Sequence, residues 1–191
     1  MKRICKTLVI IVVMVLSSCS DSNTHISSND KYEIVVLPDG SIAYLNSNSS
    51  ISYNKDFWER IVRQEGEVFF EVRKGKAPFI VKTELGEIKV LGTKFNVKTD
   101  KKELVVEVQE GTVELRINKF VKKVKKGQKA FFKESNDAIK VYKAEFKHKN
   151  WFNNLNKEFK KFGKEMNKSF KQIGKESKKM GIEVGNMVKD L

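Results

Sequence analysis

Cysteine and histidine are scarce in this sequence, which contains two of each among 191 residues. Cys5 lies in a stretch that is typical of a removable export signal, so Cys19 would be the one cysteine left and no disulfide within the chain is expected. His25 and His148 are isolated and do not form the cluster of ligands that a metal site needs. No pairing of a nucleophile with a base is visible. We therefore expect neither an enzyme nor a bound cofactor.

A long apolar run is also missing. The run from Leu8 to Leu16 is too short to span a bilayer and follows three basic residues, which is typical of an export signal over residues 1–18. The stretch Leu16-Ser17-Ser18-Cys19 looks like a bacterial lipobox, in which the Cys19 thiol takes a diacylglycerol group. An ordinary signal with an unrelated cysteine and a short membrane anchor are the alternatives. The lipobox predicts a lipid-anchored protein of the cell envelope, in the outer membrane.

The chain is strongly basic. Its formal charge of +14 falls to +11 when residues 1–18, with their three positive charges, are removed. Residues 147–191 hold 12 lysines and 5 acidic residues, so much of the excess lies at the C-terminal end. A basic stretch can bind nucleic acid or an anionic membrane, but an exported protein seldom meets nucleic acid. We expect no nucleic-acid partner.

Residues 66–97 alternate apolar and polar side chains, as half-buried strands require, because successive side chains of a strand point to opposite faces. Glycine and proline dipeptides separate the short runs. Phe70, Phe79 and Phe95 are expected in the shared core. Several short strands are therefore predicted to stack here.

Further strands are predicted before this stretch, at residues 32–37, 42–45 and 51–53, with polar turn residues between them. Residues 19–30 are rich in serine, asparagine and aspartate and are expected to form a flexible tether. Residues 31–146 are expected to form one β domain.

An internal repeat lies within this domain. Residues 64–72, Gln-Glu-Gly-Glu-Val-Phe-Phe-Glu-Val, resemble residues 109–117, Gln-Glu-Gly-Thr-Val-Glu-Leu-Arg-Ile. Each copy predicts a strand, a Glu-Gly turn and a second strand, with glycine at the left-handed corner. The rhythm indicates a β-sandwich or a solenoid-like stack of short strands. Glu65 and Glu67 flank the first turn, and without a nucleophile or histidine they are interpreted as exposed carboxylates rather than an acid–base pair.

A set of signature residues runs through the domain in a fixed order. They are Leu37, Pro38, Asp39, Gly40, Ser41, Gly66, Glu67, Pro78, Phe79, Gly92, Thr93, Phe95 and Gly111. With these residues, the region 31–134 resembles the FecR family, the periplasmic sensory domains of transmembrane anti-sigma regulators typified by iron-dicitrate uptake control. The resemblance implies an all-β, twisted, solenoid-like stack. It also implies that the domain receives a signal from the N-terminal domain of a TonB-dependent outer-membrane transporter.

The resemblance is expected to stop short of the complete family pattern. A usual member begins with a cytoplasmic segment that holds the sigma factor, followed by a transmembrane helix, and ends with a small α/β domain that contacts the transporter. We expect neither end in this chain. The resemblance then implies a fold and a protein-binding surface, but not anti-sigma activity. The expected partner is an envelope protein such as a transporter signalling domain or a transmembrane regulator.

Residues 147–191 are predicted to form a long basic amphipathic helix, because an eleven-residue repeat makes three helical turns and gathers the apolar positions in one stripe. Three supports for it stay open: an anionic membrane surface, self-association into a homo-oligomer, or packing of its first turns on the β domain. The stripe consists of Trp151, Phe152, Leu155, Phe159, Phe162, Met166, Phe170 and Ile173, and the opposite lysines include Lys164, Lys168 and Lys175.

Taken together, these features predict a mainly β protein with a FecR-like stack followed by a long C-terminal amphipathic α-helix. The first functional hypothesis is a non-enzymatic envelope lipoprotein whose FecR-like domain binds protein and is accessory or regulatory in envelope signalling. The alternative is a structural scaffold, membrane-associated or self-associating, that acts through the C-terminal helix.

Overall fold

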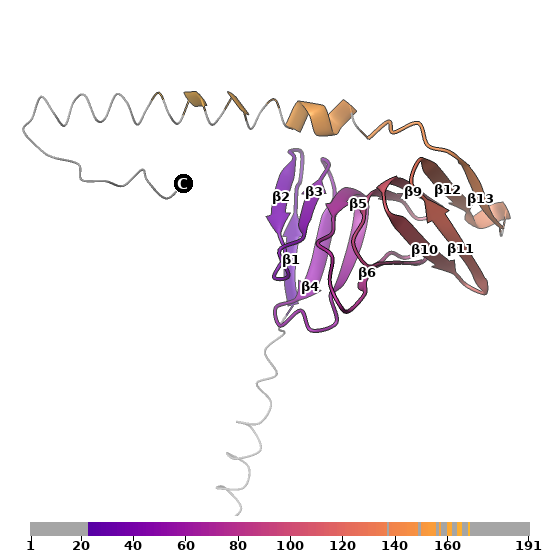
Figure 1. The fold of residues 1–191 in the computed structure, drawn as a ribbon. Helices are drawn as coiled ribbons and strands as arrows, with labels where there is room; N and C mark the ends of the chain where they lie inside the picture. Colours follow the sequence, from indigo (N-terminus) through magenta and orange to yellow (C-terminus); the bar gives the residue numbers. More distant parts are fainter. Residues whose placement is uncertain are drawn as a thin grey trace, which may run out of the picture. The chain divides into compact units, whose positions relative to one another are not determined.

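The computed structural model describes residues 23–136, 138–148 and 150–155, together with residues 157, 160, 161, 164, 165 and 168. The chain divides after Ala144 into two units, and each is described by itself. Figure 1 labels most strands of the first unit, which are numbered in chain order. The export signal and Cys19 lie outside the described residues, so export and lipidation stay predictions.

Thirteen strands form the described part of the first unit. Most are short and are separated by polar turns, as the sequence predicted, and one 3₁₀ turn, Glu134–Asn136, precedes the last strand. The prediction of a mainly β fold is confirmed. The strands are β1 (Asn23–Ser27), β2 (Glu33–Val36), β3 (Ile42–Leu45), β4 (Ser50–Asn54), β5 (Ile61–Glu71), β6 (Phe79–Lys82), β7 (Glu87–Val90), β8 (Lys94–Thr99), β9 (Glu103–Glu110), β10 (Thr112–Ile117), β11 (Phe120–Lys125), β12 (Gln128–Lys133) and β13 (Ala138–Lys143).

The long strand β5 belongs to both sheets of the domain. Its first half pairs with β4 and, in parallel, with β6. Its second half, from Gly66 onward, pairs with β3 and β8. The strand therefore starts in one sheet, here named sheet A, and ends in the other, named sheet B.

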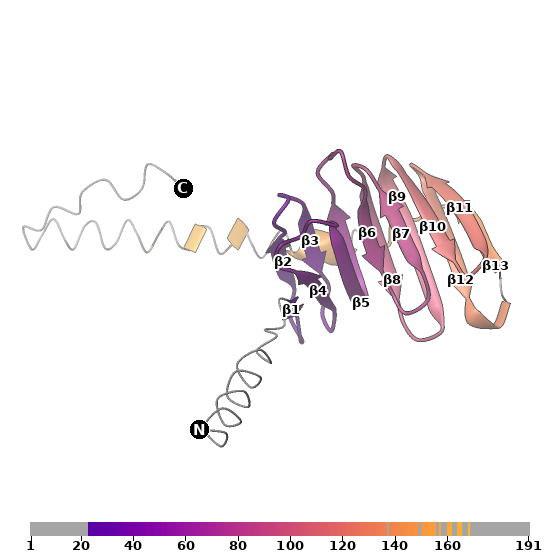
Figure 2. The same ribbon diagram turned by 90° about the horizontal axis from the view of Figure 1, so that it is seen from below.

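The remaining hairpins alternate between these two sheets. Sheet A has the order β1-β4-β5-β6-β7-β10-β11, and sheet B has the order β2-β3-β5-β8-β9-β12-β13. Figure 2 shows the strands from β5 to β13 following one another along the domain, from magenta to orange. Successive hairpins along the chain are therefore added to sheet A and sheet B in turn.

The core lies between the sheets and contains the phenylalanines that the sequence placed there. Phe70, Phe79 and Phe95 are fully buried. The ring of Phe70 stacks on that of Phe95 with centroids 5.4 Å apart and meets that of Phe79 edge-on at 5.9 Å. Since these three side chains come from β5, β6 and β8, the shared strand joins both sheets to one core.

Two equivalent corners explain the internal repeat. Gly66 and Gly111 have φ angles of 79° and 85° and lie where the chain passes from one sheet to the other. A buried hydroxyl group supports each corner by donating to the carbonyl of the residue after the glycine. Ser49 Oγ does so at 3.1 Å for Gly66, and Thr93 Oγ1 at 3.2 Å for Gly111. The repeat therefore encodes a change of sheet rather than a repeated domain.

The predicted turn at the first Glu-Gly pair is wrong. β5 continues through Gly66 without reversing, and its two halves find partners in different sheets. A glycine at positive φ can redirect a strand while leaving it extended, so a local turn signal does not distinguish a corner from a reversal. The pairing partners, which are distant in sequence, decide the outcome.

The middle of the expected tether (residues 19–30) is a strand. Residues Asn23–Ser27 form β1, which pairs along its whole length with β4. Four of its five side chains are polar and most of the strand is exposed, so composition predicted a linker. Backbone pairing with β4 and the packing of Ile26 against the core override that tendency.

The second unit, from Glu145, begins with residues 150–155 in a helix. Trp151 and Leu155 are buried, Phe152 is half-buried, and Lys164 and Lys168 are helical and exposed. None of the helical segments in the described part of the chain has the length and apolarity that a bilayer span requires. The long helix stays a prediction. Outside the described residues lie Phe159, Phe162, Met166, Phe170, Ile173 and Lys175.

Candidate protein-binding surface

Asp39 and Arg60 form a buried ion pair at one end of the domain. Arg60 Nε and Nη2 lie 2.8 Å and 2.7 Å from Asp39 Oδ2, and the side chains are 10% and 15% exposed. The Asp39 carboxylate also accepts hydrogen bonds from the backbone N–H and the hydroxyl of Ser41, at 2.8 Å and 2.9 Å. The signature residues Asp39 and Ser41 therefore position Arg60.

Arg60 in turn fastens the loop between β5 and β6. Its Nη1 donates to the carbonyl of Ala77 at 2.6 Å, and its Nη2 donates to the carbonyl of Arg73 at 2.7 Å. The guanidinium also lies over the Phe79 ring, 5.6 Å from its centroid. Gly75 packs against the guanidinium so closely that a Cβ there would collide with it. One side chain thus holds three loops together.

Glu67 is part of a network and is not the exposed carboxylate that the sequence predicted. Its side chain is 14% exposed. Its two carboxylate oxygens accept hydrogen bonds from Asn96 Nδ2 at 3.0 Å and Asn46 Nδ2 at 3.2 Å, and Lys98 Nζ lies 3.7 Å away. These partners come from β8 and the β3–β4 turn, which sequence spacing alone does not bring together. Glu67 therefore links the corner at Gly66 to both neighbouring strands.

Three further signature residues line a shallow hollow of about 560 Å³ beside the β7–β8 turn, where Leu91 is 56% exposed. Pro78, Gly92 and Thr93 belong to this lining. Packing accounts for Gly92 and Thr93, because a Cβ on Gly92 would lie 2.9 Å from Lys74 Cβ and Thr93 supports a sheet corner. We therefore regard this hollow as the weaker candidate for a binding site.

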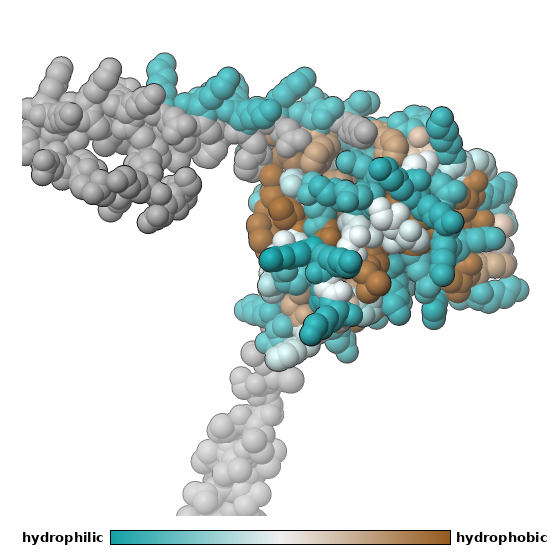
Figure 3. Space-filling model, viewed as in Figure 1, coloured by the Kyte–Doolittle hydropathy of each residue, from teal (hydrophilic) through white to brown (hydrophobic). Residues whose placement is uncertain are grey.

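Trp58 is the most exposed large apolar side chain among the described residues. It is 86% exposed, against 38–68% for the other five such side chains, Val36, Leu91, Val121, Val141 and Tyr142. On the face drawn in Figure 3, hydrophilic side chains predominate and apolar ones lie between them. Single exposed apolar side chains are common on protein surfaces, so Trp58 is a candidate binding residue only together with the loop and groove around it.

The loop that carries Trp58 is fixed on both sides. Phe57 is buried and packs edge-on against Tyr53 and Phe79, with ring centroids 5.6 Å and 6.1 Å apart. Arg60 is held by its ion pair. Both Phe57 and Arg60 have positive φ angles, 50° and 49°, which residues with a Cβ adopt only under constraint. The loop therefore presents Trp58 in a defined position.

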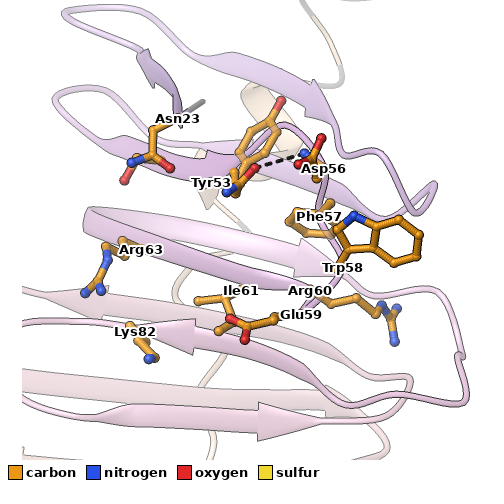
Figure 4. A pocket seen from close by; sticks show the side chains of 12 residues that line it. Asn23, Tyr53, Asp56, Phe57, Trp58, Glu59, Arg60, Ile61, Arg63 and Lys82 are labelled. Carbon is orange, nitrogen blue, oxygen red and sulfur yellow. Dashed lines mark hydrogen bonds between the residues drawn. The ribbon is translucent and has the colours of Figure 1, made fainter. Parts of the chain in front are cut away.

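A groove of about 580 Å³ opens beside Trp58 (Figure 4). Tyr53, Phe57 and Ile61 contribute apolar surface, and Arg63 and Lys82 contribute positive charge from β5 and β6. Asp56 and Glu59 of the loop contribute negative charge. A volume of this size fits a few side chains of a protein partner. The sequence patterns did not single out Trp58. Two adjacent aromatic residues within a charged loop were the available signal.

No group of three or more histidine, cysteine, aspartate or glutamate side chains in the described part of the chain is arranged to hold a metal ion.

The comparison with known families follows from this fold. Residues 23–114 match the family described as FecR protein, and they include the corner at Gly66, the Asp39–Arg60 pair and the Trp58 groove. The β domain belongs to the FecR family.

Two solved structures resemble the chain. They are crystal structures, at 2.50 Å and 1.65 Å resolution, of a candidate anti-sigma factor from Parabacteroides distasonis ATCC 8503. Each has a TM-score of 0.60 and 33% sequence identity, and the match covers 63% of this chain. The chain spans 60% and 59% of the length of these neighbours. No curated protein matches the chain.

Proposed function

We propose that this chain is a non-enzymatic regulatory protein of the bacterial cell envelope and that its FecR domain binds another envelope protein through the Trp58 groove. The family match supports a regulatory role in envelope signalling, and the anti-sigma assignment of the structural neighbours agrees with it. The observation that carries the proposal is Trp58 itself, 86% exposed on a loop fixed by Phe57 and Arg60.

Tryptophan is the side chain most enriched among residues that dominate binding energies, since it buries a large rigid area at a small loss of conformational entropy. A preorganised loop increases that advantage, because less ordering is needed when the partner binds. The partner would be a transporter signalling domain or a transmembrane regulator. The export signal and Cys19 would place the chain at the outer membrane, anchored by lipid.

Replacing Trp58 with alanine is expected to weaken partner binding by roughly 30-fold, corresponding to about 2 kcal/mol for a dominant interface residue. Because the Trp58 side chain is mostly exposed and makes few contacts, the free energy of unfolding should change by less than about 0.5 kcal/mol. Affinity capture from native envelopes with the full chain, followed by quantitative mass spectrometry, measures this loss. Val36→Ala is the matched control, since Val36 is an exposed apolar residue too, at 68%, but lies on β2. Equal recovery with both variants would contradict a binding role for Trp58.

A further inference from the structure

The groove beside Trp58 carries two positive charges that the fold itself does not use. Arg63 on β5 and Lys82 on β6 are directly paired in register, so their side chains leave the same face of sheet A. Neither forms an ion pair or a side-chain hydrogen bond within the described part of the chain. Like charges on neighbouring strands disfavour folding, so this pairing gives the domain no stability.

Asp56 and Glu59 also line the groove, but no carboxylate forms an ion pair with Arg63 or Lys82 among the described residues. Glu87 is the register neighbour of Lys82 on β7 but forms no ion pair with it in the described residues. Figure 4 shows Arg63 and Lys82 on one side of the groove, with Asp56 and Trp58 on the other. The groove therefore has two cations on its strands, and an aromatic ring with the carboxylates of Asp56 and Glu59 on its loop.

We propose that the groove receives an extended acidic segment of the partner protein, with an apolar side chain against Trp58 and a carboxylate between Arg63 and Lys82. This inference rests on the proposed function and adds the chemistry of the partner. Charge complementarity supports it, because a carboxylate would relieve the repulsion between the two cations. The apolar surface of Tyr53 and Ile61 between the two ends suits a peptide chain.

Short peptides test the charge requirement directly. The probes are acetyl-Phe-Thr-Asp-Asp-amide and its counterparts with two asparagines or two lysines. They are titrated into the solubilised full chain, kept free of acyl groups by Cys19→Ser, and followed by the indole N–H signal of Trp58. The aspartate peptide should bind at least about fivefold more tightly than the asparagine peptide, as two partly exposed ion pairs allow. Equal binding of all three peptides would overturn the proposal.

A charge reversal provides the matched control. The double variant Arg63→Glu, Lys82→Glu should prefer the lysine peptide, whereas Lys122→Glu, Lys125→Glu on β11 changes the net charge equally and should keep the preference for aspartate. Reversal in both variants would show that only the overall charge matters and would overturn the site. Binding to phosphatidylglycerol vesicles through Arg63 and Lys82, with no peptide binding, would also overturn it in favour of a membrane surface.

These results are distinct from a failure of the proposed function. If Trp58→Ala abolishes partner capture while the Arg63→Glu, Lys82→Glu variant retains the partner, protein binding stands and the acidic-segment inference falls. If Trp58→Ala retains the partner, the groove itself is not the binding surface, whatever the peptides show.

Discussion

The Gly66→Ala variant is expected to lose about 2–5 kcal/mol of folding free energy. An L-residue at φ 79° costs about 1–2 kcal/mol. The added Cβ would also lie 2.8 Å from the carbonyl oxygen of Asn48 and 2.9 Å from Ser49 Cα, and overpacking of this kind costs about 1–3 kcal/mol more. Backbone atoms of the β3–β4 turn cannot move away without disturbing the corner. Urea denaturation, with the slope checked for constancy, measures the loss.

Gly127→Ala is the matched control for this prediction. Gly127 has nearly the same φ angle, 81°, but no heavy atom lies within 4 Å of the position a Cβ would take. It should lose only the conformational part, about 1–2 kcal/mol. The difference between the two variants then isolates the close packing at the corner where β5 changes sheets. Equal losses would mean that the corner at Gly66 is not closely packed.

The Arg60→Ala variant is expected to lose about 3–5 kcal/mol, because it leaves the Asp39 carboxylate buried without its charged partner. The carbonyls of Arg73 and Ala77 lose their donors at the same time. Arg60→Lys should recover only part of this, since an ammonium group cannot reproduce the planar set of donors. Chemical denaturation of both variants measures the effect.

Arg63→Ala provides the comparison within the same strand region. Arg63 is exposed and has no ion pair among the described residues, so its removal should change stability by less than about 0.5 kcal/mol. A loss of less than about 1 kcal/mol for Arg60→Ala would contradict the view that the Asp39–Arg60 pair holds the loops. In that case the position of Trp58 would also lose its structural explanation.

The strands and the core were predictable because they depend on local periodicity. Ile42–Leu45 has the bounds that the sequence indicated, and Phe70, Phe79 and Phe95 are buried as expected. Alternation with a period of two identifies which side chains face inward, whichever strands become neighbours. Gly66 shows the limit of this reasoning, because its role depends on pairing partners far away in the chain.

The contacts of the candidate site were not predictable for the same reason. Asp39 and Arg60 are 21 residues apart, as are Asn46 and Glu67, and nothing in the sequence states that they meet. The signature residues identified the family, but they did not reveal the structural role of each residue. Trp58 was missed because exposure is a property of the folded loop. Phe57 and Arg60 fix that loop with positive φ angles although neither is glycine, so the sequence gives no local signal for this backbone geometry.

Site-specific photocrosslinking tests the binding role of the groove most directly. A benzophenone amino acid replaces Glu59, which is exposed and lines the groove, or Lys102, which is exposed in the β8–β9 turn. Both full-length chains are irradiated in native envelopes. If the FecR domain binds through the Trp58 groove, we expect a discrete protein adduct from position 59 and none from position 102. No adduct from position 59, or the same adducts from both positions, would contradict it.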